Sequence, residues 1–520
     1  MVDRVKYPVD KANFKAIRQE NYLYVDKTSY VHEISSIGTY YFLARPRRFG
    51  KSMFLDTLSE YFKGNKELFQ GLEIERLQPG DWESYPVVKF NLTGGSFLEK
   101  GDLTSLIAHE LERNEKLHQI ERSKKNINER FNDLIVSLNE KYGKKAVILI
   151  DEYDAPLSSA IGKPDLQEIY REQLHGFYSV LKKAEEHIRF CMLTGVTRYG
   201  KVSVFSGLNN LNDITFDNKY AGICGITKEE LRKYYSEGVE ELAKKEGITI
   251  EDTYDLLRFH YDGYHFSDLM LDIYNPFSIN YAFANLSIED YWCQSGTPTV
   301  LAKTLIKNDQ SIKALIGSKV ETAELKNLSM HNLEPVALFY QTGYLTLKSY
   351  EAKRKVFTLG YPNREVETGI LRNVLKVYTE APRNVGLTVY DMEDAFEEGN
   401  PEQAVKILKS FLSDIPLDLR EDVKRYENYY HTIFYCIIKL MGLDIDAEYA
   451  TSEGYIDILV KTKDYIYVIE LKVNGTAEDA LKQIEEKHYS EPFASDSRKL
   501  FKIALGFSKS TGTISSSIIS

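Results

Sequence analysis

The chain has 520 residues, of which 43% are hydrophobic and 28% are charged, and its formal net charge at pH 7 is -11. Enough apolar material is present for several cores, and at roughly 100 to 200 residues per domain the length indicates about three domains. The acidic balance excludes a protein that coats nucleic acid by bulk electrostatics, so any nucleic-acid contact must use local basic patches. The four cysteines show neither zinc-ligand spacing nor a disulfide framework.

The N-terminal stretch MVDRVKYPVDKANF contains no apolar run of signal-peptide length. No segment of the chain approaches the roughly 18 uninterrupted apolar residues of a membrane-spanning helix. We therefore expect a cytoplasmic protein without a membrane partner, and a homo-oligomer is compatible with the sequence.

Residues 1–225 alternate strand-like and helix-like segments, which is typical of a parallel sheet flanked by helices. Uninterrupted runs of Val, Ile and Leu indicate strands that are covered on both faces. The predicted strands are 39–44, 85–92, 145–151 and 188–195, and a long helical stretch covers 103–143. This region is predicted to be an α/β domain.

Residues 226–385 change to short helices and aromatic-rich turns, which predicts a mainly helical, winged-helix-like middle region. Thr227 opens a capping-box pattern, and Thr249 precedes a second helix. No cluster of residues in this region suggests chemistry.

Residues 386–520 begin with helices, and Asn400 and Pro401 mark the start of one of them. A helix, a three-stranded meander, another helix and a final strand are predicted to follow as a compact α/β unit. Their ranges are 425–442, 446–452, 454–462, 465–473, 477–491 and 499–508. The Ser-rich end, from residue 508 onward, is expected to fray.

The stretch YYFLARPRRFGKSMFLDTL, residues 40–58, predicts a phosphate-binding loop. A strand, a loop and a helix follow one another, so the positive end of the helix would face an anion. Gly50, Lys51 and Ser52 match the end of the Walker A pattern G-x-x-x-x-G-K-[ST]. In that pattern the lysine reaches the β and γ phosphates and the hydroxyl binds Mg2+.

The position of the first glycine in this pattern holds Arg45, and Arg47 and Arg48 follow closely. We include the three arginines among the nucleotide-binding residues. Arg47 and Arg48 would contact phosphates of the bound nucleotide, of a neighbouring subunit's nucleotide, or of nucleic acid. Because a side chain at a glycine position widens a tight loop, nucleotide binding is better supported than fast hydrolysis.

The stretch KAVILIDEYDAPL is an apolar strand that ends in Asp151 and Glu152, as a Walker B element does. Asp151 would hold the magnesium ion, and Glu152 would act as general base on the attacking water. A core strand ending in solvated carboxylates is the alternative. The strand IRFCMLTGVTRYGK offers Thr194, Thr197 and Arg198, and we expect Arg198 or Thr194 to sense the γ-phosphate, with a surface arginine as the alternative.

A second site is predicted on the hairpin of GYIDILV and YIYVIELKV. Strand alternation places Glu470 and Lys472 on one face, and the short turn brings Asp457 beside Glu470. Two carboxylates and a strand carbonyl would bind a hard divalent cation, and the lysine would stabilise charge or help orient a water for phosphodiester attack. Gln483 is predicted to contact a phosphate or the attacking water, and Glu427 would complete the shell. The alternative is an exposed E-x-K pattern, which is common on strands.

The segments YVDKTSYVHEI, YYFLARPRRFGKSMFLDTL, VILIDEYDAPL and LTGVTR resemble the bacterial AAA-ATPase-like family. The C-terminal GYIDILVKTKDYIYVIELKVNGTAEDALKQI resembles the PD-(D/E)XK nuclease domain commonly fused to that family. The resemblance implies an N-terminal P-loop NTPase, a restriction-endonuclease-like C-terminal domain, and the cofactors ATP and Mg2+, with Mn2+ as an alternative. It assigns Lys51 and Ser52 to the nucleotide, Asp151 and Glu152 to Walker B, Asp457, Glu470 and Lys472 to a nuclease triad, and Gln483 to an auxiliary role.

The leading hypothesis is therefore an ATP-regulated, metal-dependent nuclease acting on DNA, with RNA as an alternative. In the first alternative, the chain is an NTPase switch for signalling or defence, and its nuclease-like domain binds nucleic acid or a partner without cleavage. In the second alternative, the chain is a small-molecule phosphotransferase, but no sequence pattern indicates a pocket for a second substrate.

Overall fold

The computed structural model of the chain describes residues 5–199, 205, 208, 210–294, 298–326, 328, 334–380, 385–415, 428–508 and 513–520. Two compact units divide the chain: Met1–Ser295 with Ile316–Glu367, and Gly296–Leu315 with Thr368–Ser520. The predicted three-domain division at residues 225 and 385 stays a prediction. Within the described ranges, no helix combines the length and the apolar character needed to cross a membrane.

A five-stranded sheet forms the core of the first unit, and its order is β2-β3-β4-β1-β5 with all neighbours parallel. Its strands are β1 (Tyr40–Ala44), β2 (Val87–Asn91), β3 (Ala146–Asp151), β4 (Ile188–Gly195) and β5 (Asn212–Asp213). The four longer strands lie within the four predicted segments, whereas β5 is too short and polar to leave an apolar run. Because β4 lies between β1 and β3, the carboxyl ends of these three strands lie side by side.

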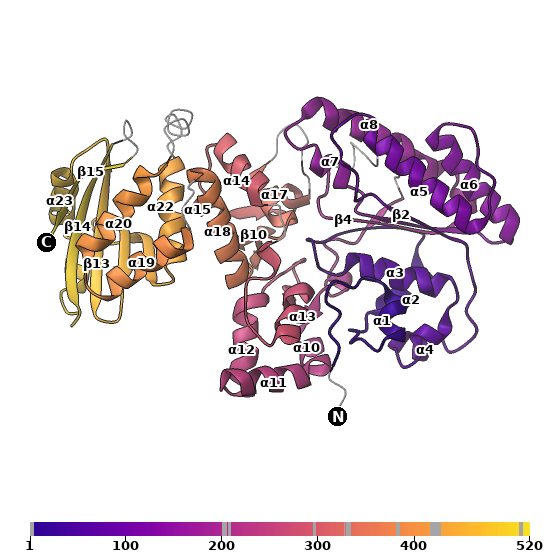
Figure 1. Ribbon diagram of the computed structural model, residues 1–520, viewed down its shortest axis with the longest axis horizontal. Helices are drawn as coiled ribbons and strands as arrows, with labels where there is room; N and C mark the ends of the chain where they lie inside the picture. Colours follow the sequence, from indigo (N-terminus) through magenta and orange to yellow (C-terminus); the bar gives the residue numbers. More distant parts are fainter. Residues whose placement is uncertain are drawn as a thin grey trace. The chain divides into compact units, whose positions relative to one another are not determined.

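Helices cover both faces of this sheet, with α5, α6 and α8 on one face and α1 to α4 on the other (Figure 1). Their bounds are α1 (Phe14–Gln19), α2 (Thr28–Ile37), α3 (Lys51–Phe62), α4 (Glu73–Leu77), α5 (Asp102–His118), α6 (Ile127–Tyr142), α7 (Ala155–Ser159) and α8 (Pro164–Lys183). The helical stretch predicted over 103–143 is two helices, because Gln119 ends α5 in the left-handed conformation. Asn126 then caps α6 by accepting two backbone N–H groups.

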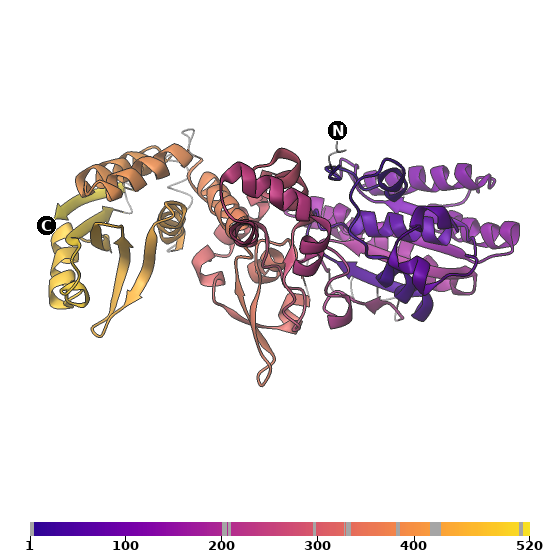
Figure 2. The same ribbon diagram turned by 90° about the horizontal axis from the view of Figure 1, so that it is seen from below.

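The remainder of the first unit is mainly helical, as predicted. Its longer helices and strands are α10 (Lys228–Tyr234), α11 (Ser236–Glu246), α12 (Ile250–Tyr261), α13 (Pro276–Asn285), α16 (Thr322–Lys326), α17 (Pro335–Gln341), β6 (Ile226–Thr227), β7 (Ile273–Tyr274), β8 (Lys319–Glu321), β9 (Thr346–Glu351) and β10 (Val356–Gly360). The capping box at Thr227 is confirmed, and Thr249 forms another. β9 and β10 form a hairpin that projects from the surrounding helices (Figure 2).

The second unit contains a five-stranded sheet in the order β11-β12-β13-β14-β15. Its elements are α14 (Pro298–Lys307), α15 (Ile312–Leu315), α19 (Val385–Glu397), α20 (Pro401–Ser413), α22 (Asn428–Leu440), β11 (Asp444–Ala450), β12 (Tyr455–Lys461), β13 (Tyr465–Val473), α23 (Ala477–Glu486), β14 (Lys499–Ser508) and β15 (Thr513–Ile519). α18 (Arg364–Thr379) begins in the first unit and continues into the second. The predicted helix, meander, helix and strand are confirmed, and Asn400 caps α20 with Pro401 behind it.

Two layers of helices pack on this second sheet. Apolar side chains from α19, α20 and α22 pack on one face, whereas α23 packs on the other through Ala480 and Ile484. β13 and β14 are parallel, with α23 as the crossover between them. Helix α23 therefore lies directly beside the face of β13 that carries Glu470 and Lys472.

The expectation that the Ser-rich end frays is wrong for residues 513–519. They form β15, which pairs antiparallel with β14 from Ile519 opposite Ile503 to Thr513 opposite Ser508. Ile514 is buried, and the backbone hydrogen bonds to β14 replace those to water. A high serine content therefore does not predict a frayed end here. A strand at a sheet edge tolerates polar side chains on its outer face.

Candidate functional site

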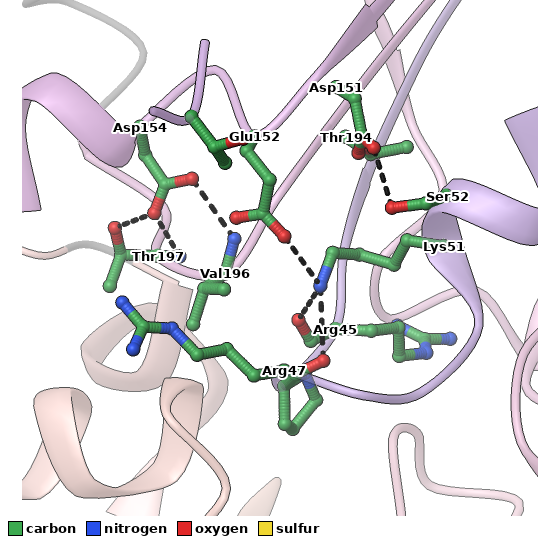
Figure 3. Close-up of polar contacts among 12 residues, drawn as sticks. Arg45, Arg47, Lys51, Ser52, Asp151, Glu152, Asp154, Thr194, Val196 and Thr197 are labelled. Carbon is green, nitrogen blue, oxygen red and sulfur yellow. Dashed lines mark hydrogen bonds and ion pairs between the residues drawn. The ribbon is translucent and has the colours of Figure 1, made fainter. Parts of the chain in front are cut away.

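Five side chains meet where β1, β3 and β4 end, and we name them the sheet-edge site: Lys51, Ser52, Asp151, Glu152 and Thr194 (Figure 3). The Asp151 carboxylate accepts the Ser52 hydroxyl at 2.5 Å on one oxygen and the Thr194 hydroxyl at 2.6 Å on the other. Ser52 lies in the first turn of α3, and Thr194 lies near the end of β4. Both oxygens of Asp151 are therefore fixed by neighbouring elements.

Lys51 is buried beneath the loop that joins β1 to α3. Its ammonium donates to the carbonyl oxygens of Arg45 at 3.0 Å and Pro46 at 3.1 Å, and it lies 3.6 Å from a Glu152 carboxylate oxygen. Gly50 precedes Lys51 with φ 93°, a left-handed conformation that favours glycine. The loop therefore keeps the turn and the lysine of a phosphate-binding loop.

Glu152 follows β3 with φ 53°, an uncommon conformation for a residue other than glycine. Burial raises the pKa of Glu152, while the positive charge of Lys51 acts in the opposite direction. The carboxyl group therefore holds a proton more readily than an exposed glutamate does.

The arginines of the loop face different surroundings. Arg45 is 1% exposed, and its guanidinium donates to the carbonyl oxygens of Ala44, Thr215 and Tyr220 at 2.9, 2.7 and 3.2 Å. Its charged carbon lies 4.2 Å from the ring centre of Phe266. The Arg45 side chain thus joins the loop to residues 215–220 instead of entering the turn, and burial lowers its pKa.

Arg47 and Arg48 are both exposed. Arg48 has φ 69°, lies 3.5 Å from Asp10 and stacks on Phe277 at 4.6 Å from the ring centre. Arg47 and Arg45 point to opposite sides of the loop (Figure 3). Burial raises the pKa of Glu152, and the charge of Arg47 makes only a small contribution in the opposite direction.

Arg198 is directed toward other segments of the first unit. Its guanidinium forms an ion pair with Asp213 and donates to the carbonyl oxygen of Lys326 at 2.8 Å, while its backbone N–H donates to Gln341 at 2.6 Å. Of the two residues considered as sensors, Thr194 is the one that contacts Asp151.

The second group, which we name the hairpin site, consists of Asp457, Glu470, Lys472 and Gln483. Glu470 on β13 is 1% exposed, and one of its oxygens accepts the Asp457 backbone N–H at 3.5 Å. The Asp457 carboxylate accepts the backbone N–H of Leu471 at 2.8 Å. Ile456 and Leu459 both pack on the α23 side although they are three positions apart, so the alternation of β12 is interrupted around Asp457.

Burial and, to a smaller extent, the neighbouring Asp457 charge together raise the pKa of Glu470 to about 7. The Lys472 ammonium lies 3.4 Å from a Glu470 oxygen, as strand alternation predicted, and it also donates to the Gln483 side-chain oxygen. The Gln483 amide donates to the Tyr489 hydroxyl at 3.3 Å. The hairpin and α23 thus bring together all four predicted residues.

Sequence reasoning missed two residues at these sites. Tyr489 is nearly fully buried beside Gln483, and a lone tyrosine after a helix gives no signal of this position. Asp154 is visible in DEYDAP, but nothing in the sequence distinguishes it from a solvated carboxylate.

Glu427, which was predicted to complete the shell of the hairpin site, lies outside the described residues. Within the described part of the chain, no group of three or more His, Cys, Asp and Glu side chains is arranged to hold a metal ion.

The sheet order and the loop of Gly50, Lys51 and Ser52 define the first unit as a P-loop nucleoside triphosphatase fold. A family model described as "Predicted AAA-ATPase" matches residues 8–205, and one described as "PD-(D/E)XK nuclease superfamily" matches residues 425–517. A protein of Azotobacter chroococcum mcd 1, titled "Uncharacterized protein in vnfD 5'region", is 33% identical over 521 residues, covering 99% of this chain and 98% of that protein. The chain belongs to the family of predicted AAA-ATPases that carry a C-terminal PD-(D/E)XK nuclease superfamily domain.

Proposed function

We propose that this protein binds and hydrolyses ATP at the sheet-edge site and cleaves nucleic acid at the hairpin site, with the nucleotide state regulating cleavage. The observation that supports it best is a feature that the two sites share. Each combines oxygen groups suited to a hard divalent cation with an adjacent lysine, as phosphoryl and phosphodiester chemistry require.

At the sheet-edge site, Ser52 and Asp151 supply a hydroxyl and a carboxylate oxygen that are already 2.5 Å apart. A hydroxyl and a carboxylate oxygen are ligand types that suit Mg2+, which prefers one or two carboxylates together with phosphate oxygens; binding the ion would replace their hydrogen bond to each other. When bound, the ion neutralises charge on the transferred phosphoryl group. Lys51 would exchange its contacts with the loop carbonyls for the β and γ phosphates of ATP.

Glu152 is proposed as the general base of ATP hydrolysis. Its raised pKa lies closer to neutral pH than that of an exposed glutamate, which favours accepting a proton from water. Arg47 would contact the phosphates from the open side of the loop, whereas Arg45 serves to hold the loop in place. Thr194 would report on the γ-phosphate through its hydrogen bond with Asp151.

At the hairpin site, Asp457 and Glu470 are proposed as the cation ligands. Their carboxyl groups are held on adjacent strands. Burial and the nearby Asp457 raise the pKa of Glu470 to about 7, and a bound cation would favour its ionised form. Lys472 would stabilise the charge that develops on the phosphate, and Gln483 orients Lys472. Mg2+ is the expected ion, and Mn2+ satisfies the same oxygen ligands.

The experiment is a cleavage assay of the full-length protein on single- and double-stranded DNA and RNA, with Mg2+ or Mn2+ and with or without ATP. We expect metal-dependent cleavage that changes with ATP, loss of the ATP effect in Lys51→Ala, and loss of cleavage in Glu470→Ala. ATP hydrolysis without cleavage of any substrate would support the switch whose C-terminal domain only binds. Cleavage that persists unchanged in Glu470→Ala would contradict the hairpin site.

A further inference from the structure

The turn after β3 is joined to the turn after β4 by a set of hydrogen bonds that includes no phosphate-loop residue. The Tyr153 backbone N–H donates to the Thr194 carbonyl oxygen at 2.9 Å, and the Tyr153 hydroxyl donates to the Thr197 carbonyl oxygen at 3.0 Å. The Tyr199 backbone N–H in turn donates to the Tyr153 hydroxyl at 3.2 Å. The two turns therefore form one connected structure.

Asp154 is the acidic side chain of the segment 151–154 that contacts residues 196 and 197 of this connection (Figure 3). It is 1% exposed, and one carboxylate oxygen accepts the Val196 backbone N–H at 3.1 Å. The other oxygen accepts the Thr197 backbone N–H at 2.7 Å and the Thr197 hydroxyl, with the Ser158 hydroxyl at 3.4 Å. A buried carboxylate with several donors from one turn fixes the path of that turn.

Gly195 makes this approach possible. A Cβ atom at this position would lie 2.5 Å from an Asp154 carboxylate oxygen and 2.6 Å from the Tyr153 ring. Both distances are too short for a side chain to be accommodated without movement of the turn. Gly195 directly follows Thr194, so the close contact lies one residue from the hydroxyl that donates to Asp151.

The far end of the same turn is also held. The Arg198 backbone N–H donates to the Gln341 side chain at 2.6 Å, and the Arg198 carbonyl oxygen accepts the Leu328 backbone N–H at 3.1 Å. Asp154 therefore restrains the turn at Val196 and Thr197, between Thr194 at the sheet-edge site and Arg198 at these contacts.

We infer that Asp154 is a positioning residue for ATP hydrolysis, which holds the turn after β4 so that the Thr194 hydroxyl stays directed at Asp151. The inference rests on the proposed ATPase function of the sheet-edge site. Asp154 acts on the reaction through Thr194 and Asp151, because its own carboxylate is occupied by Val196 and Thr197. Displacing a supporting group by about 1 Å can lower a rate by as much as about 100-fold.

The test compares ATP hydrolysis by the wild type with Asp154→Asn and with Thr197→Val and Thr197→Ser. Asn retains one acceptor oxygen and places an amide against a backbone N–H, so we expect kcat to fall by about 10- to 100-fold with KM for ATP changed by less than about threefold. Thr197→Val is nearly isosteric and removes only the hydroxyl, so a smaller loss of kcat is expected. Thr197→Ser restores the hydroxyl and should restore the rate.

Ser179→Ala is the matched control, because its hydroxyl is exposed on α8 and donates to the Gly176 carbonyl oxygen at 2.7 Å within that helix, so hydrolysis should stay unchanged. Melting temperatures are measured for every variant. If Asp154→Asn does not fold, the pair Thr197→Val and Thr197→Ser decides the question, and equal kcat in these two variants and the wild type would overturn the inference.

A double-mutant comparison separates positioning from general damage. In a Thr194→Val background, Asp154→Asn should cause little further loss of kcat, since both act through the same hydrogen bond to Asp151. A full additional loss in that background would overturn the positioning role. Absence of ATP hydrolysis by the wild type would overturn the proposed function together with this role, whereas an active wild type and an equally active Asp154→Asn variant would overturn this role alone.

Discussion

The sheet-edge site and the hairpin site differ in how the chain brings their residues together. The sheet-edge site draws on residues 51, 151 and 194, and it exists only because β4 lies between β1 and β3. The hairpin site comes from two adjacent antiparallel strands and the next helix, all between Asp457 and Gln483. One site thus depends on the topology of a whole domain, and the other on a short stretch of chain.

The two sites also differ in what surrounds their carboxylates. Asp151 is bound by two neutral hydroxyls, and the lysine nearby is bound by loop carbonyls. Glu470 is instead buried beside a second carboxylate; burial and that carboxylate raise its pKa to about 7, although Lys472 acts in the opposite direction. The Asp151 carboxylate is thus already satisfied by neutral donors, whereas the Glu470 carboxylate, buried beside a second carboxylate, gains most from an added cation.

The largest effect should come from separating the two sites. Glu470→Gln keeps the size of the side chain and removes its charge, so we expect cleavage to fall by about 100-fold or more, the upper end for changes around a metal. ATP hydrolysis should stay within about twofold of the wild type, because Glu470 contributes no group to the sheet-edge site. Glu478→Gln, at an exposed position on α23, is the charge-matched control. Parallel loss of ATP hydrolysis in Glu470→Gln would show that the sites are not separable.

Substituting the arginines of the loop should show that Arg45 contributes to the stability of the fold and Arg47 to ATP binding. Arg45→Met leaves buried carbonyl oxygens without a donor, and each such group costs about 1–3 kcal/mol, so the free energy of unfolding should fall by about 3 kcal/mol. Arg47→Met should change stability by less than about 0.5 kcal/mol, as expected for a surface position. It should weaken ATP binding by about tenfold, which corresponds to about 1.4 kcal/mol.

Urea unfolding followed by tryptophan fluorescence measures the stability part of this prediction. Both tryptophans of the chain, Trp82 and Trp292, lie in the first unit, so the signal reports on that unit. Equal stability losses in Arg45→Met and Arg47→Met would contradict the different roles assigned to the two side chains.

At the hairpin site, Tyr489→Phe should have a smaller effect. It removes the acceptor that orients the Gln483 amide, and a hydrogen bond worth about 0.5–1.5 kcal/mol predicts a loss of cleavage rate of about 2- to 10-fold. The measured quantity is kcat for cleavage, and Tyr465→Phe in the same sheet is the control. If Tyr489 acts through Gln483, the loss should disappear in a Gln483→Ala background.

The last prediction concerns the pH dependence of the stability of the first unit. Glu365 is buried, and burial raises its pKa from 4.5 to about 8, with Asp290 adding to the shift. The folded protein therefore keeps a proton that the unfolded chain releases between these values, so stability should fall as pH rises, by at most about 1.4 kcal/mol per pH unit. Glu365→Gln should flatten this dependence in urea unfolding, and Glu367→Gln should not. An unchanged slope in Glu365→Gln would assign the dependence to other groups.

Local sequence patterns predicted much of the fold. The apolar runs at 39–44 and 188–195 became β1 and β4, because strands covered on both faces need apolar side chains at every position. The capping box predicted at Thr227 is confirmed as well, because a cap depends on residues only three positions apart. β5 and β15 were missed, because each is defined by its partner strand rather than by its own side chains.

For the functional sites, the sequence by itself determined the chemical groups: the lysine and hydroxyl after Gly50, the carboxylates that end β3, and the acidic pair with Lys472 on the hairpin. Spacing could do this because strand alternation and strand ends place neighbouring residues predictably. Only the tertiary structure decided three contacts. Thr194 donates to Asp151, the Arg45 guanidinium donates to the Thr215 carbonyl oxygen, and Asp154 accepts hydrogen bonds from the turn after β4. These contacts join residues that are far apart in the chain, so they depend on strand order and burial, which no local pattern encodes.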